Sequence, residues 1–156
     1  MVGNSARQNS PSIQHWPRSP RRLNSRNRRT IMPITATPAG ADARLEQIAR
    51  LNDRTRLGLD RTARVVITRN CLERLAEAES APEEPIVLQA RLMAAFRYCA
   101  FSEDSPERDF ASIEFLGRKV WMKIDYYDAA MEFGSEDPAD ASITTRVMTI
   151  LLPEDY

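Results

Sequence analysis

The stretch FASIEFLGRKVWMKIDYY, residues Phe110 to Tyr127, decides the fold of this chain. Apolar and polar residues alternate on both sides of Gly117, as they do in strands that bury one face. The pattern predicts strands over 110–116 and 119–127. The two residues between them, Gly117 and Arg118, form the predicted turn, because glycine suits the tight connection of a β-hairpin.

The register of this hairpin predicts which side chains share a face. A two-residue turn pairs three apolar couples, namely Phe115 with Val120, Ile113 with Met122, and Ala111 with Ile124. These couples form the buried face. The opposite, less buried face then carries Ser112, Glu114, Lys119, Trp121, Lys123, Asp125 and Tyr127.

Helical spacing of apolar residues appears in three segments before the hairpin. The first predicted helix runs from a cap at Asp42 to residue 55, the second covers 70–78, and the third covers 86–100. A last apolar strand is predicted over 144–152, ended by Pro153. Together with an early strand, this order predicts an α+β fold with a mostly antiparallel four-stranded sheet and about three helices on one face.

The early strand covers residues 64–68, with the sequence RVVIT. Its β-branched residues follow one another with little polar alternation. A continuous run of this kind is typical of a strand that is covered on both faces. We therefore predict that this strand is central in the sheet and buried.

The N-terminal segment 1–40 is rich in Arg, Ser and Pro and poor in apolar residues, so we predict a disordered leader before a single domain over 41–156. Seven arginines and no acidic residue precede Asp42, so the remaining chain has 15 basic and 22 acidic residues. Three interpretations of the leader stay open: a nucleic-acid-binding arm, an organellar transit peptide, or an upstream extension of a protein that starts at Met32.

Several function classes lack their residues in this sequence. The one histidine is His15, in the leader, which excludes a Ser-His or Cys-His pair within the predicted domain. Cys71 and Cys99 are too far apart for a metal-binding pair motif, and no glycine-rich nucleotide loop is present. No apolar run is long enough to span a membrane. We expect a cytoplasmic protein without a cofactor.

The densest cluster of polar and aromatic residues is KIDYYD, residues 123–128, at the end of a predicted strand. Strand ends often display binding groups on a rigid scaffold. Asp125 and Asp128, with Asp109 or Glu107, could instead gather around Mg²⁺ for hydrolysis. The purely structural interpretation places Asp128 in a turn, Tyr126 in the core and Lys123 beside Glu114. The candidate binding residues are Trp121, Lys123, Asp125, Tyr127, Asp128 and Arg146.

Trp121 has two further interpretations. Between Lys119 and Lys123 on a sheet face, it could stack on the bases of a single-stranded nucleic acid. The acidic balance of the predicted domain opposes that interpretation, because a polyanion is repelled. The structural alternative is that a helix covers Trp121, and we favour it.

Several motifs together resemble an uncharacterised bacterial family known as domain of unknown function 3768. They are RLND at 50–53, VVITR at 65–69, KIDYYD at 123–128, FGS at 133–135, DPAD at 137–140, TTRV at 144–147 and EDY at 154–156. The resemblance covers about residues 43–156. It implies an alphaproteobacterial protein, a bacterial cytoplasmic location, a link to mobile elements and a start at Met32, but no activity.

This chain departs from the family pattern at two places. Where the family has a histidine followed by Asp-Phe-Gly, this chain has Arg108, Asp109, Phe110 and Ala111. In addition, Met122 separates Trp121 from the lysine that the family tryptophan touches directly. Both departures favour a structural or binding role over chemistry.

The leading hypothesis is a non-enzymatic accessory module that binds a protein partner through its acidic loops and the aromatic face of its strands. The first alternative is a metal-dependent hydrolase or nuclease using Asp109, Asp125 and Asp128. The second is a nucleic-acid-associated protein that uses the arginine-rich leader, which requires translation from Met1.

Overall fold

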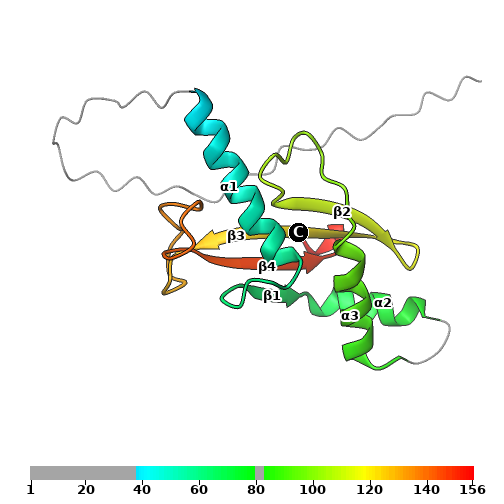
Figure 1. The fold of residues 1–156 in the computed structure, drawn as a ribbon. Helices are drawn as coiled ribbons and strands as arrows, with labels where there is room; N and C mark the ends of the chain where they lie inside the picture. The colour runs from blue at the N-terminus through cyan, green and yellow to red at the C-terminus, as the bar shows by residue number, and fades with distance from the viewer. Residues whose placement is uncertain (1–37, 80–82) are drawn as a thin grey trace, which may run out of the picture. The chain divides into compact units, whose positions relative to one another are not determined.

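The computed structural model describes residues 38–79 and 83–156. They form three helices and a four-stranded sheet, which confirms the α+β class (Figure 1). The predicted leader, including His15 and Met32, lies outside the described residues apart from positions 38–40. The elements are α1 (Pro38–Arg56), β1 (Arg64–Ile67), α2 (Arg69–Ala78), α3 (Pro85–Phe96), β2 (Phe110–Phe115), β3 (Arg118–Tyr127), β4 (Thr145–Leu151) and the short 3₁₀ helix η1 (Pro153–Asp155).

The sheet has the strand order β1-β4-β3-β2. β3 runs antiparallel to β2, to which a two-residue turn joins it, and also antiparallel to β4, which follows after the long loop 128–144. β1 runs parallel to β4, so the sheet is mixed. The long connection between the two strands, which includes α2, α3 and the hairpin, permits this parallel pairing.

The hairpin has the predicted faces but a different register. β2 pairs with β3 so that Phe115 lies opposite Arg118 and Ile113 opposite Val120, and the turn is Leu116-Gly117. Both turn residues have positive φ, 51° and 71°, a combination typical of a type I′ turn. The predicted turn was wrong because it made glycine the first turn residue, whereas here glycine is the second. The pairing moves by two residues, so every side chain keeps its face.

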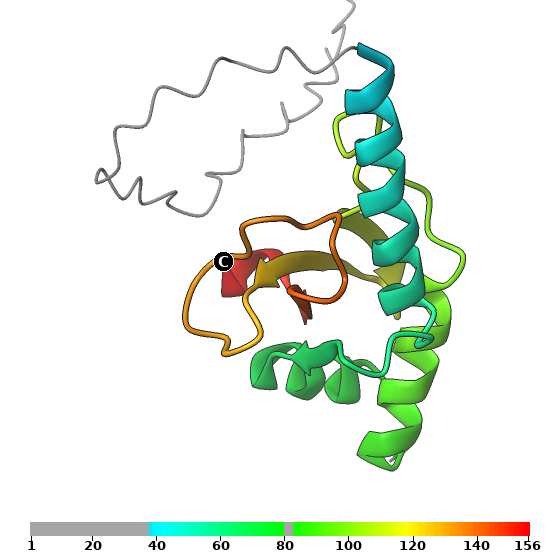
Figure 2. The same ribbon diagram turned by 60° about the vertical axis from the view of Figure 1, so that its left-hand side comes forward.

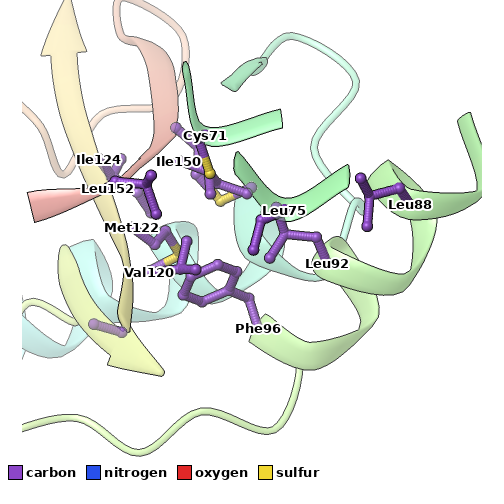
Figure 3. Close-up of a cluster of buried hydrophobic side chains, with 12 residues drawn as sticks. Cys71, Leu75, Leu88, Leu92, Phe96, Val120, Met122, Ile124, Ile150 and Leu152 are labelled. Carbon is purple, nitrogen blue, oxygen red and sulfur yellow. The ribbon is translucent and has the colours of Figure 1, made fainter. Parts of the chain in front are cut away.

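All three helices pack on one face of the sheet, and α1 crosses in front of β3 and β4 in Figure 1. Figure 2 shows α2 and α3 on the side of the molecule where β1 lies. Between these two helices and the strands lies the apolar core, with Phe96 of α3 completely buried (Figure 3). Its members are Cys71, Leu75, Leu88, Leu92, Phe96, Ala111, Val120, Met122, Ile124, Met148, Ile150 and Leu152.

Two helix boundaries differ from the sequence prediction. α1 begins at Pro38 instead of Asp42, since proline is well suited to the first turn of a helix. Residues 38–40, predicted as the end of a disordered leader, are therefore helical. α3 ends at Phe96 instead of residue 100, so Cys99 lies just beyond the helix and is partly exposed.

The early strand is the clearest error of the sequence prediction. β1 is an edge strand that pairs only with β4, and Val65 and Val66 are 45% and 47% exposed. The apolar run RVVI was predicted to be central because such runs normally have cover on both faces. In this structure no described element pairs with the outer side of β1.

The described helices include none whose length and apolar character would suit a transmembrane segment.

Candidate functional site

The helices α1, α2 and α3 all pack on the other face and leave the second face of the sheet uncovered. The favoured interpretation that one of them covers Trp121 was therefore wrong. Ser112, Glu114 and Lys119 are exposed on this second face, and Trp121 is partly exposed beside Ser112. We call this surface the open face. Its residues are Phe110, Ser112 and Glu114 of β2, Lys119, Trp121, Lys123, Asp125 and Tyr127 of β3, and Thr145, Val147, Thr149 and the buried Leu151 of β4.

Four of the predicted binding residues come together on the open face. Lys123 and Asp125 form an ion pair of 2.6 Å, and their side chains are 25% and 21% exposed. Trp121 makes an edge-to-face contact with Phe110, with ring centroids 5.6 Å apart. Because residues two apart on a strand share a face, Tyr127 extends the same row. The row therefore offers aromatic and charged groups side by side.

The two other predicted binding residues lie elsewhere. Asp128 follows β3 and its Oδ1 accepts a hydrogen bond of 3.0 Å from the backbone N–H of Glu132, as the structural interpretation predicted. Arg146 pairs with Tyr126 across β4 and β3, so it points to the helix-covered face and is completely buried. Placing Arg146 in the same site as Trp121 was wrong, because the two side chains lie on opposite faces of the sheet.

Arg146 organises a buried polar network on the covered face. Its Nε donates a hydrogen bond of 2.9 Å to Oδ1 of Asn52, and its Nη2 donates to the carbonyl oxygen of Pro138. The guanidinium carbon also lies 5.5 Å from the centre of the Tyr126 ring, a cation–π distance. Arg146 therefore connects α1, the sheet and the loop before β4.

Asn52 and Tyr126 complete this network. The Nδ2 of Asn52 donates 2.7 Å to the Tyr126 hydroxyl and 2.9 Å to the carbonyl oxygen of Glu107. The Tyr126 hydroxyl donates to Oε2 of Glu107 at 3.2 Å. The amide of Asn52 thus uses its oxygen and its nitrogen, which offsets the cost of burying it. We call Asn52, Glu107, Tyr126, Pro138 and Arg146 the Arg146 network.

The electrostatics of the network follow from its burial. Desolvation lowers the pKa of the Arg146 guanidinium, while Tyr126 and Asp60 act in the opposite direction. Desolvation is also the main cause that raises the pKa of the Tyr126 hydroxyl, so this hydroxyl remains a neutral donor. Within the described part of the chain, Nη1 of Arg146 has no hydrogen-bond partner.

A second buried arginine ties α1 to α3. The Nη1 of Arg56 donates to the carbonyl oxygens of Phe96 and Arg97, at 2.8 and 2.6 Å. These carbonyls belong to the carboxyl end of α3, where a cation is favourable. Asp53 accepts from Arg56 at 2.8 Å and also pairs with Arg108, so the three side chains form an ion-pair network.

The motifs that carry the family resemblance meet in this region, although they are far apart in the sequence. Asn52 comes from RLND, Tyr126 from KIDYYD, Pro138 from DPAD and Arg146 from TTRV. The sequence analysis did not identify Asn52 as a site residue. Its signal is a polar residue four positions after Ile48 on the apolar stripe of a helix, where both are buried.

The three carboxylates of the metal hypothesis do not gather. Asp109 lies before β2 and accepts a hydrogen bond of 2.8 Å from Ser105, whereas Asp125 faces the open side of the sheet in its pair with Lys123. Asp128 belongs to the following turn. Over residues 38–79 and 83–156, no cluster of three His, Cys, Asp or Glu side chains suits a metal ion.

The two cysteines have the properties of structural residues. Burial, with the nearby charges of Asp155 and Glu154, raises the pKa of the Cys71 thiol to about 11. Burial also raises the pKa of Cys99. A reactive cysteine needs a lowered pKa to form its thiolate, so these thiols act mainly as small apolar groups.

Comparison with known families matches residues 76–155 to the family described as Protein of unknown function (DUF3768). The match includes β2, β3, β4 and most of the Arg146 network. This chain therefore belongs to that family. No curated protein and no solved structure gives a significant match to the chain.

Proposed function

We propose that this protein is a non-enzymatic module that binds a protein partner through the open face of its sheet. The observation that carries the proposal is the row formed by Trp121, Lys123, Asp125 and Tyr127 on the face of the sheet opposite α1, α2 and α3. Tyrosine and tryptophan are enriched at protein interfaces, because they bury a large area with few rotatable bonds. Among the described residues, no His, Cys, Asp and Glu side chains form a group that could hold a metal ion, and the pKa values of both cysteine thiols are raised.

Charge on the open face favours a protein partner over a nucleic acid. Lys123 is paired with Asp125, and Lys119 lies opposite Glu114 in the hairpin. A phosphate backbone would therefore meet a carboxylate beside each of these two lysines. From Asp42 onward the chain has 15 basic and 22 acidic residues, which also repels a polyanion. The nucleic-acid alternative depends on the leader, outside the described residues.

The experiment uses two matched substitutions of a small exposed residue by arginine. Ser112→Arg places a long charged side chain beside Trp121 on the open face, and Ala76→Arg places one on the exposed side of α2. Wild-type, S112R and A76R chains are expressed in the native cells, and proteins bound to them are crosslinked and identified. We expect at least one protein that wild type and A76R retain and S112R loses. An identical set of bound proteins for all three chains would refute the proposed face.

The family resemblance also leads us to propose an alphaproteobacterial cytoplasmic location and a link to mobile elements. Membrane and soluble fractions of native cells test the location, and recovery mainly with the membranes would contradict it. The genes adjacent to this one test the link, which predicts transfer or integration functions nearby.

A further inference from the structure

The outer edge of β1 has backbone groups without a strand partner among the described elements. Thr68 donates its N–H to the carbonyl oxygen of Ile150 in β4, at 3.0 Å. The backbone N–H and C=O groups of successive residues alternate in direction along a strand. Those of Val66 therefore also point toward β4, whereas those of Val65 and Ile67 point outward. The edge thus presents the N–H and C=O groups of two residues, as in strands that accept another strand.

An apolar groove lies beside this edge on the helix side of the sheet. Its volume is about 500 Å³, and Ile86 at its border is 69% exposed. Val65 and Ile67 also point into it from β1. The lining residues are Val65, Ile67, Leu72, Ile86, Gln89, Ala90 and Met93.

Three exposed arginines surround the edge. Arg61 precedes β1, Arg64 is its first residue, and Arg69 begins α2 directly after it. None of the ion pairs formed between described residues involves them. Arg64 pairs with Val147, so it lies on the open-face side, opposite the groove. Val66 shares that side with Arg64 and is 47% exposed. The edge is therefore apolar on the groove side and carries one arginine and one valine on the other.

We propose that β1 accepts an extended segment of a partner protein as a fifth strand of the sheet. Alternate side chains of that segment enter the groove and are apolar, and the side chains between them face Arg64 and are acidic. Addition of this strand makes β1 central, as its continuous apolar sequence predicted. The inference rests on the proposed interaction role but concerns a different surface, at the opposite side of the sheet from β2.

A second copy of this chain fits the edge less well. Pairing two β1 strands would bring two sets of Arg61, Arg64 and Arg69 together, and such like charges across an interface oppose association. An acidic segment instead neutralises these arginines.

The test measures binding of labelled synthetic peptides to the full chain by fluorescence anisotropy. One peptide alternates glutamate with valine over about eight residues, and its control has lysine in place of glutamate. We expect the glutamate peptide to bind and the lysine peptide to bind at least roughly tenfold more weakly. Failure of the glutamate peptide to bind, or equal binding of both, overturns the proposal.

Three variants locate the binding site. Val65→Pro removes an outward N–H and leaves the bonds to β4, because proline is tolerated at an edge whose N–H faces solvent. Ile86→Glu places a charge at the groove and affects only an exposed residue of α3. Both should weaken the glutamate peptide at least roughly tenfold. Arg64→Glu should reduce the preference for the glutamate peptide, because only Arg61 and Arg69 then remain.

The outcomes separate this inference from the proposed function. S112R lies on the far strand β2 and should bind the glutamate peptide like wild type. Equal loss of binding in S112R and I86E would mean nonspecific association and would overturn the proposal. So would dimerisation in sedimentation experiments that I86E abolishes, since a second copy would then be the occupant. None of these peptide results decides whether S112R loses a cellular partner.

Discussion

The covered face and the open face of the sheet are built from the same strands, yet their polar side chains differ in burial and in bonding partners. On the covered face, Arg146 and Asn52 are completely buried and bonded to groups from distant segments. On the open face, Lys123 and Asp125 pair with each other within one strand and keep partial contact with water. Polar groups on the covered face therefore hold the tertiary structure together, while those on the open face contribute little to it.

The largest expected effect is the loss of an aromatic side chain from the covered face. Phe96→Ala leaves a cavity at the centre of the core and should lower the free energy of unfolding by about 3–5 kcal/mol. The open-face change Val147→Ala removes a smaller and partly exposed side chain and should cost less than about 1 kcal/mol. Urea denaturation of both variants measures the difference, and similar losses would contradict the distinction between the faces.

Arg146→Ala should produce the next largest loss. The substitution leaves Oδ1 of Asn52 and the carbonyl of Pro138 without their donor, so we expect about 2–3 kcal/mol of destabilisation. Arg146→Lys should recover only part of it, because an ammonium group cannot reproduce the guanidinium geometry. Urea denaturation gives both values. Wild-type stability of the alanine variant would show that the Arg146 network does not hold α1 to the sheet.

The adjacent residues Tyr126 and Tyr127 allow the same substitution to be compared on the two faces. The Tyr126 hydroxyl accepts from Asn52 and donates to Glu107, so Tyr126→Phe should cost about 1–2 kcal/mol. The neighbouring Tyr127 points to the open face, and Tyr127→Phe should change stability by less than about 0.5 kcal/mol. Thermal denaturation at the same pH compares them. A larger loss for Tyr127→Phe would reverse the roles assigned to the two faces.

Asp155 should make stability depend on acid pH. Burial raises the pKa of its carboxyl group, but hydrogen bonds from Thr68, Leu152 and Asn70 together outweigh burial and leave it lowered. The folded state therefore binds this proton less tightly than the unfolded state. The resulting stability is fully present above the unfolded value of about 4 and is lost as the pH falls through the lower folded value.

The variant Asp155→Asn isolates this contribution. At neutral pH it should be less stable than wild type by about 1 kcal/mol, the usual net value of a hydrogen bond. The difference should shrink as the pH decreases below about 4, because wild-type Asp155 is then protonated as well. Urea denaturation across this pH range measures it, and a difference that grows toward acid pH would contradict the sign of the shift.

The smallest effect on stability is expected for the open-face substitution Ser112→Arg. Its position is exposed, so the free energy of unfolding should change by less than about 0.5 kcal/mol. The same variant is expected to lose a cellular partner. Thermal denaturation beside the capture experiment therefore separates loss of binding from loss of folding, and a strongly destabilised S112R would show that the open face is needed for folding.

Sequence reasoning found most of the open face and missed the Arg146 network. The period of two in the hairpin placed Trp121, Lys123, Asp125 and Tyr127 on one side, and a register error of two residues left that result unchanged. In β4 the sequence TRVMTIL has no clear alternation, so the direction of Arg146 could not be read. Asn52 stands 94 positions before Arg146, and no local pattern indicates that the two are bonded.

By itself, the sequence determined the α+β class, the two faces of the hairpin and the apolar stripes of the helices. These features repeat with the period of the local backbone, so they depend only on neighbouring residues. Tertiary structure alone decided that β1 lies at an edge and that Arg146 points inward to Asn52. Both result from the pairing of β4 with strands on either side, and such pairing between distant segments has no local signature.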